Sequence, residues 1–129
     1  MTEYIDFNEE ITQELFKCMR LGPIIEIVEE KGKEKIRRDL KEKKYDIICG
    51  KIKVLTFSKE REPAHFLIQK AGEECRFSIE TGEPLDQMPK ELGRFSRNIK
   101  KWYKKNRNAL IVFYNDNLPD DAPPTARIN

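Results

Sequence analysis

The stretch from residue 64 to residue 79 most constrains the fold of this 129-residue chain, because its residue types alternate around one two-residue turn. With Ala71 and Gly72 at that turn, the chain folds back as a β-hairpin, and glycine supplies the positive φ that such turns need. Beyond an opposite-charge pair next to the turn, one face carries only apolar side chains: Ala64, Phe66, Ile68, Cys75, Phe77 and Ile79. A slip of one residue would mix the two faces, so the pattern predicts antiparallel strands over 64–70 and 73–80.

The opposite face of this hairpin carries the only histidine of the chain, His65. The register places His65 across from Ser78, with Arg76 and Glu80 nearby on the second strand. An imidazole titrates near neutral pH and suits proton transfer, so His65, Arg76 and Glu80 form a candidate catalytic site. The alternative is a surface histidine that bonds to Ser78 or to a loop carbonyl. The sequence leaves both open, and with them the question of whether the chain is an enzyme.

No metal or cofactor site is predicted. Cys49, His65 and Cys75 follow no zinc-ligand spacing, and the hairpin register sends Cys75 and His65 to opposite faces. The sequence also contains no Walker loop, no G-x-G-x-x-G and no G-x-S-x-G motif. Buried structural thiols are therefore the simpler interpretation of the cysteines.

The clearest helix is predicted over 89–105. Its apolar residues fall on one arc at 100° per residue, and they are Leu92, Phe95, Ile99, Trp102 and Tyr103. Five cations fall on the opposite arc: Lys90, Arg94, Arg97, Lys101 and Lys104. Such a face can neutralise several phosphates, so these five are the candidate nucleic-acid-binding residues. The alternative is an ordinary lysine-rich surface, because 37% of all residues are charged.

The first 50 residues are predicted to be mostly helical. Asn8 is a plausible N-cap for a helix whose apolar stripe is Ile11, Leu15, Phe16 and Met19, and Gly22-Pro23 ends it. The run 24–30 fits a strand or a helix equally, and 33–44 is helix-prone. Residues 1–16 carry five acids and no Lys or Arg, so the two charged ends of the chain could also pair between molecules.

The remaining segments define the expected domain. A strand is predicted over 51–57 from its β-branched and aromatic residues. We expect one domain over 1–118, divided into an N-terminal region 1–50 and a core 51–118, with 119–129 as a flexible, proline-rich tail. Three cysteines without C-x-x-C spacing favour a reducing compartment, and no charged-then-apolar leader or long apolar run is present. A cytoplasmic location without membrane contact is therefore expected.

Two short motifs resemble a known family. Pro63-Ala64-His65-Phe66 and Ile79-Glu80-Thr81-Gly82-Glu83-Pro84-Leu85 are similar to the P-P-H-F-H-[VA] and I-E-T-G-E-V-L motifs of a small prokaryotic family of unknown function. The resemblance extends from Lys51 to Asp116. Members are often encoded in toxin–antitoxin-like pairs and are described as candidate toxins. The resemblance implies that 108–117, which has strand propensity, is a helix.

One departure from the family motif bears on chemistry. The second histidine of P-P-H-F-H falls on Leu67 here, and residues two apart in a strand share a face. The family pair would place two imidazoles together, whereas this chain keeps one. Either that pair is not catalytic or this chain has altered the activity.

These observations predict an α+β domain, with an antiparallel sheet of about three strands covered by the C-terminal helix. The first hypothesis is a toxin–antitoxin-type protein that acts on or binds RNA, DNA or a nucleic-acid-associated target through the basic helix face. The second is a non-enzymatic interaction or regulatory module, antitoxin-like, that binds a cognate toxin or antitoxin or a second copy of itself.

Overall fold

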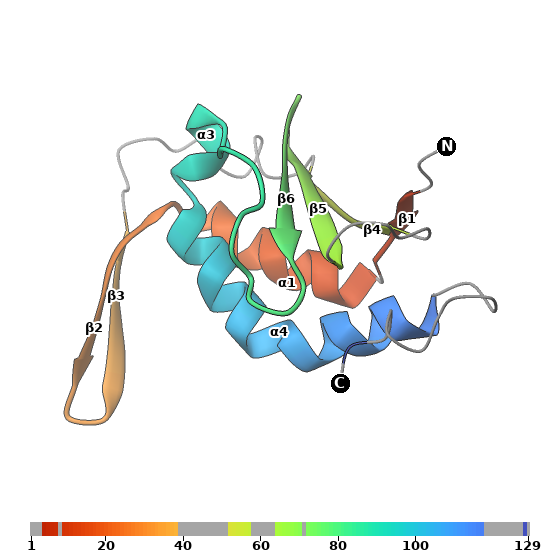
Figure 1. Ribbon diagram of the computed structural model, residues 1–129. Coiled ribbons are helices and arrows are strands. Elements are labelled where there is room, and N and C mark those ends of the chain that lie inside the picture. Colours follow the sequence, from red (N-terminus) through yellow and green to blue (C-terminus); the bar gives the residue numbers. More distant parts are fainter. Residues whose placement is uncertain are drawn as a thin grey trace.

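The computed structural model confirms an α+β fold, with two antiparallel sheets and a long C-terminal helix (Figure 1). The residues that it describes are 4–7, 9–38, 52–57, 64–70, 72–117 and 128.

The larger sheet has four strands in the order β1-β4-β5-β6, each antiparallel to its neighbour. Its strands are β1 (Tyr4–Asp6), β4 (Ile52–Phe57), β5 (His65–Lys70) and β6 (Glu73–Ser78). The three predicted strands are confirmed, and β1 is an addition to the prediction. At three residues β1 is too short to show an alternating pattern, so only its pairing with β4 reveals it.

The predicted register of the β5–β6 hairpin is confirmed. His65 lies opposite Ser78, Phe66 opposite Phe77, and Leu67 opposite Arg76. Gly72 has the positive φ of +87° that the turn requires. The apolar face of the hairpin therefore points into the core and carries Phe66, Ile68, Cys75 and Phe77, all buried.

The N-terminal region is mixed, and the prediction that it is mostly helical is wrong. Helix α1 (Glu9–Arg20) buries Ile11, Leu15 and Met19 as its pattern indicates, and Gly22 closes it with φ of +102°. The predicted cap Asn8 lies outside the described residues. After α1 the chain forms a second sheet, made of β2 (Ile24–Glu30) and β3 (Lys33–Arg38).

The β2–β3 hairpin replaces the helix predicted over 33–44, of which 39–44 lie outside the described residues. Lys31 and Gly32 both have positive φ, +55° and +76°, which is the geometry of a two-residue hairpin turn. Cross-strand ion pairs then join Glu30 to Lys35 at 2.8 Å and Glu26 to Arg37 at 4.0 Å. Turn geometry and cross-strand pairing thus override the helix propensity of a charged segment. Figure 1 shows the hairpin projecting from the rest of the fold.

The helix predicted over 89–105 is two helices, α3 (Lys90–Gly93) and α4 (Ser96–Asp116). The break follows Gly93, the poorest helix former between Lys90 and Asp116. Glu73 of β6 fixes the start of α3, because its carboxylate accepts the N–H groups of Glu91 at 3.3 Å and Leu92 at 2.8 Å. The segment 108–117, expected to be helical from the resemblance, is helical up to Asp116 as the end of α4.

Helices α1 and α4 pack on one face of the large sheet and on each other (Figure 1). Trp102 and Tyr103 of α4 both meet the ring of Phe66, with ring centroids 5.8 and 6.1 Å apart. The Trp102 indole N–H donates to the Ile11 carbonyl at 2.9 Å, and the Tyr103 hydroxyl donates to the Ile79 carbonyl at 2.6 Å. Both aromatic residues are therefore core residues, as their place on the apolar arc of the predicted helix indicates.

The tail predicted to be flexible is anchored at Ile128. The Asn115 side chain accepts from the Ile128 N–H at 3.0 Å and donates to its carbonyl at 2.7 Å, and Ile128 is buried. The rest of 119–129 lies outside the described residues. Among the helices that are described, none combines the length and apolar composition needed to cross a lipid bilayer.

Gly82, in the loop after β6, holds a position that only glycine fits. Its φ is +75°, and an added Cβ would lie 2.4 Å from the Tyr103 ring. Gly72 has a similar φ of +87° but open space around the same position.

We expect Gly72→Ala to lower the free energy of unfolding by about 1–2 kcal/mol, from backbone strain alone. Gly82→Ala should cost about 1–3 kcal/mol more, because the Tyr103 ring must also move. Urea unfolding of the two variants beside the wild-type chain measures the difference. Equal losses would mean that the Tyr103 contact does not constrain Gly82.

Candidate functional site

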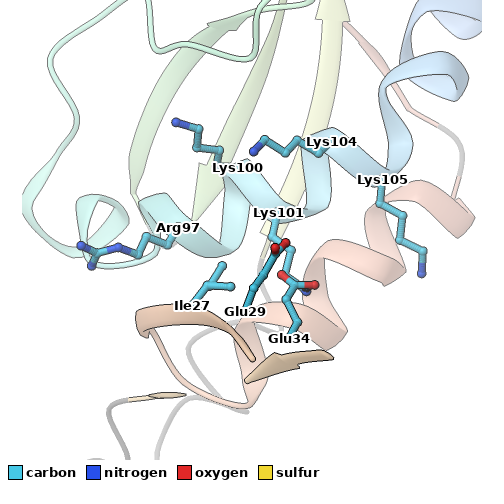
Figure 2. A pocket seen from close by; sticks show the side chains of 8 residues that line it. All are labelled: Ile27, Glu29, Glu34, Arg97, Lys100, Lys101, Lys104 and Lys105. Atoms are coloured by element: carbon cyan, nitrogen blue, oxygen red, sulfur yellow. Dashed lines mark hydrogen bonds and ion pairs between the residues drawn. The ribbon is translucent and has the colours of Figure 1, made fainter. Parts of the chain in front are cut away.

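Cations of α4 line an open cleft between α4 and the β2–β3 hairpin (Figure 2). The cleft has a volume of about 890 Å³. Its lining side chains are Ile27, Glu29, Glu34, Arg97, Lys100, Lys101, Lys104 and Lys105. Five cations of α4 and two carboxylates of the hairpin therefore line this cleft.

The helix period places these cations on one side of α4. Residues three and four apart lie on the same face of a helix, and 97, 100/101 and 104/105 follow that spacing over successive turns. The opposite side of α4 is buried through Ile99, Trp102 and Tyr103. Packing of the apolar side on the core thus leaves the basic side outside the core, with Lys101 directed at the hairpin (Figure 2).

The predicted basic face and the observed one overlap in part. Arg97, Lys101 and Lys104 line the cleft. Lys90 belongs to α3, and Arg94 lies in the junction between the helices, where it pairs with Glu91 at 3.1 Å. The helix break at 94–95 separates these two from the lining set.

Lys100 and Lys105 complete the set and were not among the predicted residues. Their signal was present in the sequence, because each is adjacent to a predicted cation and falls on the same broad arc of α4. The prediction of one continuous helix from residue 89 included Lys90 and Arg94 in the basic face in their place.

The five cations differ in how they are paired. Lys101 reaches both carboxylate oxygens of Glu34 at 3.2 and 3.3 Å, and Lys105 lies 3.6 Å from Glu14 of α1. Within the described parts of the chain, no ion pair joins Arg97, Lys100 or Lys104 to an acid. Figure 2 shows Lys100 and Lys104 extending to the same side of α4. These exposed side chains are available to an anion.

The hairpin that forms the second wall is fixed at its base by Asn98. This α4 side chain is fully buried, and its amide oxygen accepts the Ile24 N–H at 2.8 Å. Its amide nitrogen donates to the carbonyls of Cys18 at 3.0 Å and Gly22 at 3.1 Å. Arg38, at the end of β3, donates to the same two carbonyls at 2.8 Å each. Both strands are therefore tied to the end of α1, and Asn98 ties that junction to α4.

The acidic N-terminal helix and the basic helix pack together within one chain. The Glu14–Lys105 pair and the Trp102–Ile11 hydrogen bond join them. Part of the charge complementarity that could have joined separate molecules is thus used internally.

The predicted catalytic residues are only partly brought together. His65 is 1% exposed, so the interpretation of a surface histidine is wrong. Arg76 lies on the same face of the sheet as His65, diagonal to it across the β5–β6 pair. Glu80 is exposed in the turn after β6, where its carbonyl accepts from Arg107 at 3.2 Å.

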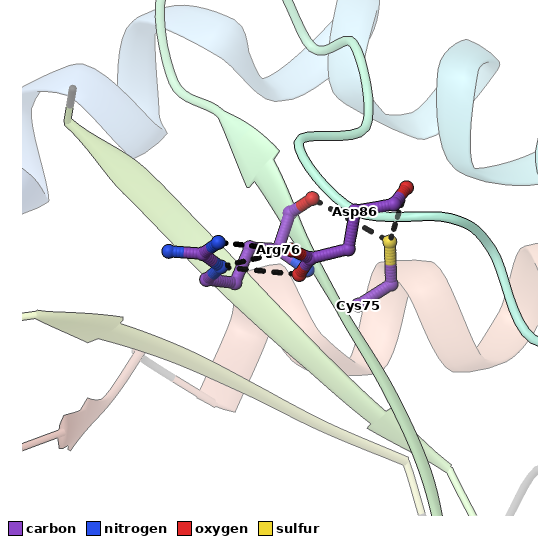
Figure 3. A network of polar contacts seen from close by, with 3 residues as sticks. All are labelled: Cys75, Arg76 and Asp86. Atoms are coloured by element: carbon purple, nitrogen blue, oxygen red, sulfur yellow. Dashed lines mark hydrogen bonds and ion pairs between the residues drawn. The ribbon is translucent and has the colours of Figure 1, made fainter. Parts of the chain in front are cut away.

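Asp86, which was not predicted, is a carboxylate that meets Arg76. It accepts from Arg76 Nη2 at 2.9 Å, from Nε at 3.1 Å and from the backbone N–H at 3.1 Å (Figure 3). These bonds, chiefly those from the Arg76 side chain, lower the pKa of Asp86, and the nearby His65 adds to the effect. Asp86 reaches this place because 83–85 returns along β6, through hydrogen bonds from Ser78 to Glu83 and from Leu85 to Arg76. A catalytic role for His65, Arg76 and Glu80 stays a prediction.

Cys75 contacts the same segment from the core side of β6. Burial raises the pKa of its thiol, which also lies 3.8 Å from the Asp86 carbonyl (Figure 3). Cys75 and His65 lie on opposite faces of the sheet, as the register predicted. The described residues hold no group of three or more histidine, cysteine, aspartate or glutamate side chains that could bind a metal ion.

Comparison with known proteins gives no further guide. No protein-family model, no curated protein and no solved structure matches the chain. The resemblance carried by residues 63–66 and 79–85 therefore stays a prediction from the sequence.

We expect Asn98→Ala to lower the free energy of unfolding by about 2–4 kcal/mol, because the Ile24 N–H loses its buried acceptor. The matched control is Asn106→Ala in the same helix. Asn106 donates only to the Trp102 carbonyl, one turn away, so its loss should cost less than about 1 kcal/mol.

Denaturant unfolding with amide hydrogen exchange tests this anchor. Asn98→Ala should also lower the protection of the Ile24 amide relative to amides in β5. Unchanged protection at Ile24 would mean that Asn98 does not hold the hairpin.

Proposed function

We propose that the chain binds nucleic acid through the phosphate backbone, with Arg97, Lys100 and Lys104 as the principal contacts. The observation that carries this proposal is the row of cations on one side of α4, facing an open cleft. Lys101 and Lys105 add to the local positive potential, although each is already near an acid.

The spacing of the cations suits a polymer with regularly repeated charges. Successive helical turns are about 5.4 Å apart, so the cations from 97 to 104 form a ladder about 10 Å long. A ladder of this kind contacts consecutive phosphates and binds without reading sequence.

Binding of fluorescent oligonucleotides, followed by anisotropy from 50 to 200 mM salt, tests the proposal. Wild-type affinity should fall steeply with salt, because each neutralised phosphate releases counterions. The double variant Lys100→Ala and Lys104→Ala should weaken binding similarly for all sequences. It should also reduce the slope of log K against log salt by about 2.

The matched control removes two exposed lysines outside the cleft, through Lys53→Ala and Lys90→Ala. This control loses the same net charge, so it should keep most of the affinity and slope. Equal losses in the two double variants would indicate only a general charge effect. Absence of saturable binding by the wild-type chain would overturn the proposal.

The toxin–antitoxin role belongs to the same proposal as its biological setting, and it rests on the sequence resemblance. If the chain is a toxin that acts through this cleft, induction of the wild-type chain should arrest growth of a bacterial host. The Lys100 and Lys104 double variant should relieve the arrest, and the Lys53 and Lys90 control should not, at equal soluble expression. Growth unaffected by any of the three chains would count against the toxin hypothesis.

A further inference from the structure

The cleft has two walls of opposite charge. The α4 wall is cationic, whereas the hairpin wall presents Glu29 and Glu34 beside the partly exposed Ile27. The other acids of the hairpin point away from the cleft. Glu26 pairs with Arg37 and Glu30 with Lys35 on the outer face.

Glu29 and Glu34 stand directly opposite each other in the β2–β3 register. Like charges at such a position destabilise a hairpin, by roughly 0.2–1 kcal/mol. Lys101 pairs with Glu34 at 3.2 Å, and this single ion pair offsets only part of the repulsion between the two glutamates. Natural proteins tend to keep unfavourable local pairs, such as two opposed carboxylates, at functional sites. A bare polyanion would be repelled by these two carboxylates, so phosphate binding alone does not explain them.

We propose, on the basis of the nucleic-acid binding proposed above, that the cleft takes a single strand, with phosphates on the α4 wall and base amino groups on Glu29 and Glu34. A glutamate accepts well from the exocyclic amino group of cytosine. Ile27 lies on the hairpin wall with Glu29 and offers an apolar surface to a base. A strand with unpaired bases presents phosphates on one side and the amino groups of its bases on the other, without the second backbone of a duplex.

The size of the cleft agrees with a strand and not with a duplex. Its volume of about 890 Å³ lies in the range of ordinary ligand pockets. A duplex would have to remain outside, in contact with the exposed lysines alone. Binding there would not involve Glu29 or Glu34.

Oligo(C) and oligo(U) twelve-mers at pH 7.5 form a matched pair of probes, because they differ at the position of the amino group. Wild-type chain should bind rC12 at least about tenfold more tightly than rU12, which is the low end of the value of one added hydrogen bond to a charged acceptor. It should bind a mixed-sequence duplex more weakly than either strand of that duplex. The same ratio for dC12 and dU12 would show that the sugar is not read, and a ratio found only with RNA would identify RNA as the ligand.

The double variant Glu29→Gln and Glu34→Gln should bind both strands more tightly and reduce the rC12 to rU12 ratio below about twofold. Two negative charges leave the cleft, and a neutral amide is a weaker and less selective acceptor than a carboxylate. The control Glu26→Gln and Glu30→Gln removes the same charge from the outer face of the same hairpin. It should leave the ratio unchanged.

The outcomes separate this inference from the proposed function. Equal binding of rC12 and rU12, or tighter binding of duplex, would overturn the single-strand inference while the phosphate contacts stand. An equal loss of the ratio in the outer-face control would also overturn it. Both proposals are overturned if no probe binds, or if every probe binds the Lys100 and Lys104 double variant as tightly as the wild-type chain.

Discussion

The buried amide of Asn98 is the interaction on which the arrangement of this molecule depends. One side chain of α4 bonds to the last turn of α1, to the glycine that ends it and to the first residue of β2. These three groups belong to different elements, and each needs a partner because it is removed from water. The amide therefore sets the direction in which the chain leaves the core, and with it the position of the hairpin opposite the cations of α4.

The parts of the fold that were predictable are those where a local pattern and the tertiary structure agree. The alternation on either side of Gly72 defined the β5–β6 register, and the apolar stripe of α1 defined its buried side. Prediction failed where tertiary pairing decided the structure. The segment after Gly32 has the composition of a helix, yet the turn at Lys31 and Gly32 and the ion pairs to β2 make it a strand. Helix α4 begins only at Ser96, after a break that follows Gly93, whereas the periodic pattern of apolar residues continues across this break and gives no sign of it.

For the candidate site at α4, only the chemical character of the side chains was predictable from the sequence. The positive charge of α4 follows from the sequence, whereas the cleft does not, because its second wall comes from a hairpin about 70 residues earlier in the chain. For the same reason Glu29 and Glu34 gave no signal: a glutamate acquires a role only from what it faces. At the other candidate site the register brought His65 and Arg76 to one face, but the acid beside Arg76 is Asp86 and not Glu80. A loop that returns along a strand edge places such a residue without any pattern in the sequence.

The β2–β3 hairpin contributes little to the apolar core, since Ile24 is its one buried residue. Its anchor, in contrast, is made by groups at its base. Substitutions along its outer length can therefore accumulate at small cost to folding, while each one alters the surface offered to a ligand. The stability of the hairpin and the chemistry of its surface are in this way assigned to separate stretches of the chain. A related sequence that keeps an asparagine at the position of Asn98 would hold the hairpin in the same place while the exposed residues of the hairpin diverge.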